Sequence, residues 1–129
     1  MQELFVSVTA TRVKNNLVVT LPADLSGSVL EQLRQVTLGQ VHQQRLTAVI
    51  FECSAVHYMD LHEFEQLCTT ARTVRVLGSQ PCLVGLRAGI VKYLVQSNAD
   101  CAGIRAFLDL NEALDYFAGF SEADVSHGA

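Results

Sequence analysis

Residues 47–52 read Thr-Ala-Val-Ile-Phe-Glu, a nearly continuous run of β-branched and aromatic side chains. Such a run is typical of a strand in the middle of a parallel sheet, where neighbouring layers cover both of its faces. The segment therefore predicts a central strand, and the other elements can be placed around it.

A well-marked helix follows this strand. Asp60 stands where an N-cap belongs, and Glu63 three residues later completes a capping box. Apolar side chains then recur at helical spacing, at Phe64, Leu67, Cys68, Ala71 and Val74. We expect a helix that begins after Asp60 and ends before Gly78.

The segments before the central strand predict a hairpin and a helix. Residues 4–9 and 17–21 have β-strand patterns, and the turn-forming sequence Lys-Asn-Asn at 14–16 separates them. Pro22 ends the second run. Ser28 and Glu31 have capping-box spacing, and the apolar positions that follow predict a helix over 28–43.

The segments after the second helix continue the alternation. Residues 81–86 predict a strand, and a short helix should start near Arg87 or Ala88. Residues 104–108 predict a last short strand, and Asp109 should cap a fourth helix. The order ββαβαβαβα requires right-handed crossovers and a largely parallel sheet after the hairpin. We therefore expect one α/β domain over 1–118, with a mixed sheet of about five strands and about four helices. A polar, flexible tail over 119–129 should follow.

Composition narrows the classes of function. The 129 residues are half apolar, carry a net charge of −4, and have nine scattered Lys and Arg residues, which argues against a nucleic-acid binder. A charged fraction of 17% is below the usual quarter, as expected if partners cover part of the surface. With no cationic leader and no apolar stretch of membrane-spanning length, we expect a cytoplasmic protein without membrane insertion.

The four cysteines predict no disulfide framework. Cys53, Cys68, Cys82 and Cys101 lie far apart, and no pair has the C-x-x-C spacing. We expect all four to be free thiols in the core.

The sequence predicts no enzyme, metal site or cofactor. Neither a G-x-G-x-x-G motif nor a P-loop is present. The segment most similar to these motifs is Gly85-Leu86-Arg87-Ala88-Gly89, which lacks the phosphate-binding Lys and Ser/Thr. The four histidines do not have the spacing of metal ligands; they are His42, His57, His62 and His127. Asp60 could be the phospho-accepting aspartate of a receiver domain, but the sequence has neither the acidic pair that would hold Mg²⁺ nor the lysine of such a site. We therefore interpret Asp60 as a helix cap.

Two stretches resemble a known family. Residues 52–60, Glu-Cys-Ser-Ala-Val-His-Tyr-Met-Asp, resemble the D-x-S-x-(hydrophobic)-x-(hydrophobic)-x-D pattern of STAS domains, the anti-sigma-factor antagonists, with Glu52 in place of the first Asp. Residues 77–87, Leu-Gly-Ser-Gln-Pro-Cys-Leu-Val-Gly-Leu-Arg, look like a stretch of the RsbS and RsbR type from the stressosome, with Ala88 where that group usually has Pro. The order and spacing of these motifs extend the likeness over essentially the whole chain.

The resemblance implies a non-enzymatic module for protein-protein interaction in bacterial stress signalling. In this family a Ser or Thr just after the residue matched by Asp60 is phosphorylated by a kinase, but Leu61 and His62 stand there. The usual switch is therefore expected to be missing, unless Ser54, Thr69 or Thr70 has replaced it. Thr69 and Thr70 lie too far along the helix to use its N-terminal N–H groups.

The resemblance also selects the candidate site. The partner-binding loop is expected to comprise Ser54, His57, Tyr58, Asp60, Leu61, His62 and Glu63, and a second loop Gly85, Arg87, Ala88 and Gly89. Leu61 either packs in the core or stands exposed as an apolar anchor, and we expect the second because the first helical position after a cap usually faces solvent.

The expected partners are other STAS proteins, in a homo-oligomer or hetero-assembly, together with a serine/threonine switch kinase. Two alternatives stay open at this point. One is a small-ligand or nucleotide sensor that uses the loop from Gly85 to Gly89 to bind an anion. The other is a STAS subunit of a lipid-transport ATPase complex.

Overall fold

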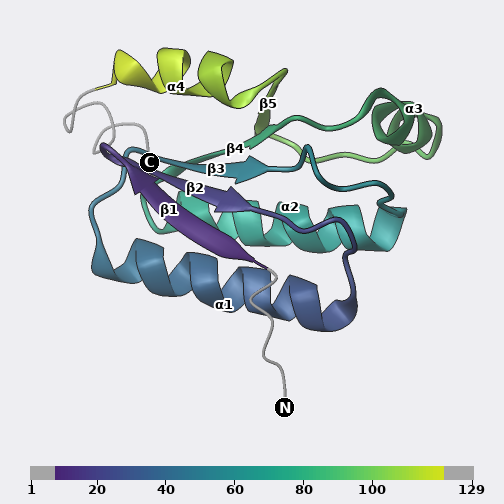
Figure 1. Cartoon of the computed structure of the whole chain (residues 1–129), viewed down its shortest axis with the longest axis horizontal. Coiled ribbons are helices and arrows are strands. Elements are labelled where there is room, and N and C mark those ends of the chain that lie inside the picture. Colours follow the sequence, from purple (N-terminus) through teal and green to yellow (C-terminus); the bar gives the residue numbers. More distant parts are fainter. Residues whose placement is uncertain (1–7, 121–129) are drawn as a thin grey trace.

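The computed structural model describes residues 8–120 and consists of one five-stranded sheet with four helices (Figure 1). The strands lie in sheet order β1 (Thr9–Val13), β2 (Asn16–Thr20), β3 (Ala48–Glu52), β4 (Gln80–Val84) and β5 (Arg105–Phe107). The helices are α1 (Gly27–Gln43), α2 (Leu61–Val76), α3 (Ala88–Gln96) and α4 (Leu110–Ala118). Only the β1–β2 pair is antiparallel, so the predicted mixed α/β sheet and its element order are confirmed.

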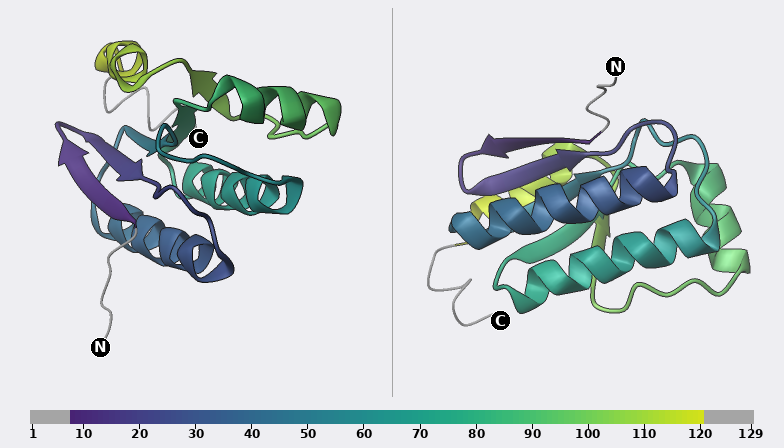
Figure 2. Two further views of the ribbon diagram at one scale, coloured as in Figure 1. Left: turned by 45° about the vertical axis from the view of Figure 1, so that its right-hand side comes forward. Right: turned by 90° about the horizontal axis from the view of Figure 1, so that it is seen from below.

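Strand β3 occupies the centre of the sheet, as predicted. Helices α1 and α2 lie side by side on one face, and α4 lies on the other (Figures 1 and 2). Val49 and Phe51 belong to the apolar cluster under α1 and α2, whereas Ile50 belongs to the cluster under α4. All three are inaccessible to solvent, which explains why the sequence of β3 is apolar without alternation.

The first strand lies later in the chain than predicted. Residues 4–9 were expected as the strand, but β1 runs from Thr9 to Val13, and residues 1–7 lie outside the described residues. Val13 pairs with Asn16, so the turn holds only two residues, and Lys14 adopts a positive φ of 56° there. Because β1 is a largely exposed edge strand, it has no apolar run that would mark it.

Some element ends also differ from prediction. Ser26, not Ser28, caps α1, since its hydroxyl accepts a hydrogen bond of 3.3 Å from the N–H of Val29. Strand β4 ends at Val84, because Gly85 turns the chain with a φ of 76°. At the other end, Phe120 packs on the ring of Phe117 at 5.4 Å, and the rest of the predicted tail, 121–129, lies outside the described residues.

The prediction of four free thiols is wrong for two of them. Cys68 in α2 forms a disulfide with Cys101, in the segment between α3 and β5, and their Cα atoms are 5.6 Å apart. Cys53 and Cys82 are free and buried. The two bridged residues are 33 positions apart, and β4 and α3 bring the chain back to α2, which residue spacing alone does not reveal.

Within residues 8–120, no helix combines the length and apolar character that a membrane crossing requires.

Candidate functional site

The loop between β3 and α2 is anchored by two buried residues that lie three positions apart. Val56 and Met59 are buried, whereas His57 and Tyr58 between them are exposed. The N–H of His57 donates a hydrogen bond of 3.3 Å to the carbonyl of Ala23, in the segment before α1. The loop is therefore held in place and presents His57 and Tyr58 outward, and Tyr58 keeps 65% of its surface exposed.

The predicted capping box closes the N-terminus of α2. The Oδ1 atom of Asp60 accepts a hydrogen bond of 2.7 Å from the N–H of Glu63, and the N–H of Asp60 donates to Oε1 of Glu63 at 2.9 Å. Both carboxylates thus lie at the positive end of the helix dipole. This end of α2 already holds two negative groups of its own.

Leu61 lies between its two predicted placements. It is half-buried at the first position of α2, so it is neither sealed in the core nor fully exposed as expected. The next residue, His62, is exposed, and Glu63 is half-buried. No hydroxyl side chain occupies positions 60–63.

The structure brings the second predicted loop against the first. The Nε of Arg87 donates a hydrogen bond of 3.1 Å to the carbonyl of Ser54, and the hydroxyl of Ser54 donates to Oε1 of Glu52 at 2.8 Å. A Cβ at Gly85 would lie 2.9 Å from Oε2 of Glu52 and 3.1 Å from Cβ of Ser54, so a side chain there would clash. Both loops thus form one edge of the molecule, with Arg87, Ala88 and Gly89 exposed.

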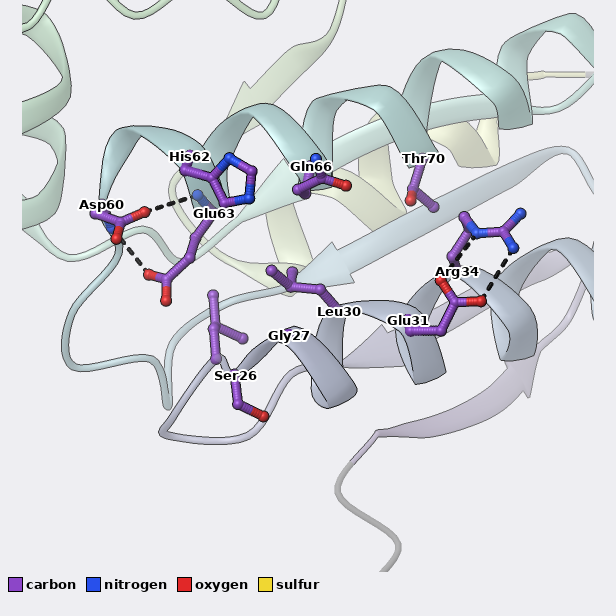
Figure 3. Close-up of a pocket in the computed structure, with 11 residues that line it drawn as sticks. Ser26, Gly27, Leu30, Glu31, Arg34, Asp60, His62, Glu63, Gln66 and Thr70 are labelled. Atoms are coloured by element: carbon purple, nitrogen blue, oxygen red, sulfur yellow. Dashed lines mark hydrogen bonds and ion pairs between the residues drawn. The ribbon is translucent and has the colours of Figure 1, made fainter.

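A groove between the first halves of α1 and α2 adjoins this edge (Figure 3). Its volume is about 420 Å³. The lining residues are Leu25, Ser26, Gly27, Leu30, Glu31, Arg34, Asp60, His62, Glu63, Gln66 and Thr70. Three of the predicted site residues therefore line one wall, and α1 supplies the other.

The groove carries charges of both signs. Arg34 and Glu31 form an ion pair of 3.0 Å on α1, and the hydrogen bond from Arg34, followed by its charge, holds the pKa of Glu31 below its usual value. The α2 wall adds Asp60 and Glu63. Such a lining suits polar side chains of a protein partner better than an apolar small molecule.

Sequence reasoning missed the contribution of α1. Glu31 and Arg34 lie 29 and 26 positions before Asp60, and nothing in their local pattern marks them as part of a site. Only the topology could have placed α1 beside the site. β2 and β3 are parallel neighbours, and both lead into helices on the same face of the sheet (Figure 1). Helices that follow such strands begin at the same edge of the sheet.

The family assignment comes from the whole chain. The sequence model of the STAS domain matches residues 7–113. The chain belongs to the STAS domain family. A comparison with curated protein sequences finds no significant match.

Several solved structures have a similar fold. An RsbS variant from Moorella thermoacetica has a TM-score of 0.74 at 22% identity, over 86% of this chain and 94% of that one. The anti-sigma factor antagonist SpoIIAA in its unphosphorylated form has a TM-score of 0.67 at 18% identity, over 88% and 99%. Murine Slc26a9, an anion transporter, has a TM-score of 0.69 at 17% identity, over 85% of this chain but 19% of the transporter.

The free thiols of this STAS domain are chemically inert. Burial, helped by the charge of Glu52, raises the pKa of Cys53 to about 12, and burial raises the pKa of Cys82 to about 12. Both stay protonated near neutral pH, so Cys53 cannot act as a nucleophile with His57. Over residues 8–120, no cluster of three His, Cys, Asp or Glu side chains is arranged to hold a metal ion.

Proposed function

We propose that this STAS domain is a cytoplasmic, non-enzymatic interaction module of the anti-sigma-factor antagonist or stressosome type. Its contact surface is residues 54–63, named here the docking loop, together with the adjoining groove. The partner is another STAS protein, in a homo-oligomer or a mixed assembly, and a serine/threonine switch kinase is a further partner. The observation that carries the proposal is the anchored loop that presents Tyr58 at the start of α2.

The anchoring of the docking loop supports a role in binding. Val56 and Met59 are almost inaccessible to solvent, so the loop loses little conformational freedom when a partner binds. Tyr58 offers a large, rigid and exposed side chain, of the type that dominates binding energy at interfaces. The mixed charges of the groove supply a polar rim.

We further propose that phosphorylation does not control docking at the start of α2. SpoIIAA has been solved in both unphosphorylated and phosphorylated forms, whereas this chain has Leu61 and His62 after Asp60. The carboxylates of Asp60 and Glu63 cap this helix end, and neither Leu61 nor His62 offers a hydroxyl for a kinase to modify. This surface would then be permanently ready to bind.

The other hydroxyls are poor substitutes. Thr70 is buried, and the hydroxyl of Thr69 donates a hydrogen bond of 2.9 Å to the carbonyl of Glu65 within the helix. Ser54 is exposed, but a phosphate on it would lie close to the carboxylate of Glu52. Like-charge repulsion disfavours that product.

The two alternatives are less well supported. The carboxylate of Glu52 lies against Gly85, which makes the loop from Gly85 to Gly89 a poor cradle for a phosphate. No feature of residues 8–120 favours a lipid-transport ATPase as partner.

The proposal is tested by two matched substitutions. Each STAS protein of the same genome, and the chain itself, is titrated against wild type, Tyr58→Ala and Val76→Ala. Tyr58 and Val76 are both exposed apolar residues, but they lie at opposite ends of α2, and Val76 keeps 83% of its surface exposed. We expect Tyr58→Ala to weaken binding by about tenfold or more, and Val76→Ala to leave it unchanged. Equal effects of the two changes, or no binding by any STAS protein, would contradict the proposal.

A further inference from the structure

The disulfide between Cys68 and Cys101 joins two parts of the fold that are otherwise loosely connected. Cys68 lies in the middle of α2, and Cys101 lies in residues 97–104, named here the α3–β5 segment. Their Cα separation of 5.6 Å lies within the usual range for a disulfide.

The two bridged residues differ in exposure. Cys68 is 1% exposed, whereas Cys101 is half-buried and its neighbours Asp100 and Ala102 are exposed. Because exchange requires direct approach to a sulfur, we expect an attacking thiolate to approach the bridge from the side of Cys101. The free Cys53 and Cys82 are fully buried and cannot compete for the same reagents.

Few other contacts hold the α3–β5 segment. A side-chain nitrogen of Arg75 donates to the carbonyl of Gly103, and Ala99 and Ile104 pack on the core while remaining partly exposed. Helix α3, which precedes the segment, buries only Ile90 and Leu94. Strand β5, which follows it, has three residues at the edge of the sheet. The bridge is thus a main attachment of this region to α2.

We propose that Cys101 is a thiol–disulfide exchange site, and that the redox state of its bridge to Cys68 sets whether the α3–β5 segment is held on α2. In the reducing direction, a thiolate of a dithiol reductant attacks Sγ of Cys101. The S–S bond breaks, Cys68 leaves as a thiolate and takes up a proton, and the second thiol of the reductant then releases Cys101 as a thiol. The reductant is oxidised to its own disulfide, and the two electrons reside in Cys68 and Cys101.

In the oxidising direction, a small-molecule disulfide of the glutathione class accepts the two electrons. The thiolate of Cys101 attacks its S–S bond, which releases one glutathione thiol and leaves a mixed disulfide on Cys101. The thiolate of Cys68 then attacks Sγ of Cys101 and displaces the second glutathione thiol as the bridge closes. This role goes beyond the proposed docking function, and its test requires no partner protein.

Release of the bridge has a defined structural consequence. Opened regions exchange their amide hydrogens faster than the core does, and a region with few buried contacts opens most readily. Residues 88–104 should therefore exchange faster after reduction, while β2 and β3, whose residues are almost wholly buried, should not change.

The test compares oxidised and reduced full-length chain, first by maleimide labelling and then by hydrogen exchange. After treatment with oxidised glutathione, we expect the intact mass to show one disulfide. After dithiothreitol, we expect Cys101 to be labelled first and Cys53 and Cys82 to stay unlabelled in the folded protein. Amide exchange over 88–104 should be at least about tenfold faster in the reduced form, as for a segment that has lost a main attachment.

Two variants serve as references. Cys101→Ser should reproduce the reduced pattern without any reductant, and Cys53→Ala should keep the bridge and its response. If Cys101→Ser fails to fold, the reduced wild type alone decides the question. Four free thiols after oxidation, or identical exchange over 88–104 in both redox states, would overturn the proposal.

Discussion

Leu61 is the residue on which the regulatory proposal depends. It occupies the first position of α2, directly after the Asp60 cap, and it is half-buried. A side chain of this kind offers apolar contact area to a partner but no oxygen to a kinase. In the proposed function, position 61 decides whether a kinase can switch this surface.

Leu61→Ser should restore a phosphate acceptor. We expect a serine kinase of the anti-sigma type from the same genome to phosphorylate Ser at position 61 in this variant and to leave wild type unmodified, as read by mass spectrometry of the tryptic peptides. Leu61→Ala serves as the control, because it removes the same side chain without adding a hydroxyl. Phosphate on wild type, at Ser54 or elsewhere, would contradict the proposed loss of the switch.

Residue patterns predicted some parts of the site and not others. Asp60 and Glu63 were predictable because a capping box involves residues only three positions apart. The exposure of Leu61 could not be predicted, because it depends on how the preceding loop packs. The bridge between Cys68 and Cys101 and the part played by Arg34 depend on tertiary contacts between distant segments, which no local pattern records.

At the scale of the elements, α4 covers one face of the sheet where two helices cover the other. Its buried side chains are Ala113 and Phe117, which pack on Ile50 and on residues of β4. The ring of Phe117 also lies 6.2 Å from that of Phe107. Phe117 is thus the one large side chain of α4 that is buried, while Leu110, Leu114 and Tyr116 are partly buried and pack against the same cluster.

Phe117→Ala should destabilise the fold strongly. Truncation of a buried Phe removes its transfer free energy and leaves a cavity, so we expect a loss of about 3–5 kcal/mol in the free energy of unfolding. Tyr116→Ala, at a half-buried neighbour in the same helix, should cost clearly less. Urea unfolding followed by circular dichroism measures both, and equal losses would show that α4 is not held by its inner face.

The elements themselves were largely predictable, and their ends were less so. The central strand and α2 have strong patterns because they are buried over most of their length or along one stripe. Strand β1 was misplaced because an exposed edge strand lacks an apolar pattern, and its register is set by the turn at Lys14. Long periodic segments are thus predictable, whereas edges and turns depend on backbone geometry.

At the scale of the whole molecule, the two buried thiols link stability to alkaline pH. Burial raises the pKa of Cys53 and of Cys82 to about 12, above the ordinary value of 9.0. Below pH 9 these thiols are protonated in both the folded and the unfolded chain, so they add no pH dependence to the free energy of unfolding. Above it, only the unfolded chain ionises, and stability is lost progressively up to about pH 12.

Stability should therefore fall more steeply with alkaline pH in wild type than in Cys53→Ala. The slope attributable to one such thiol approaches about 1.4 kcal/mol per pH unit once the unfolded thiol is ionised. Urea unfolding of both proteins at a series of pH values from 8 upward measures the difference in slope. Parallel curves would show that Cys53 is not held protonated by the fold.

We propose that this STAS domain contacts another STAS protein through the docking loop at the start of α2. Hydrogen exchange of the chain, alone and saturated with the STAS protein that binds it, tests this most directly. We predict protection on binding in residues 54–66 and at the start of α1, with α4 unchanged. Protection centred on α4 or β1, with the docking loop exchanging as in the free chain, would contradict the account.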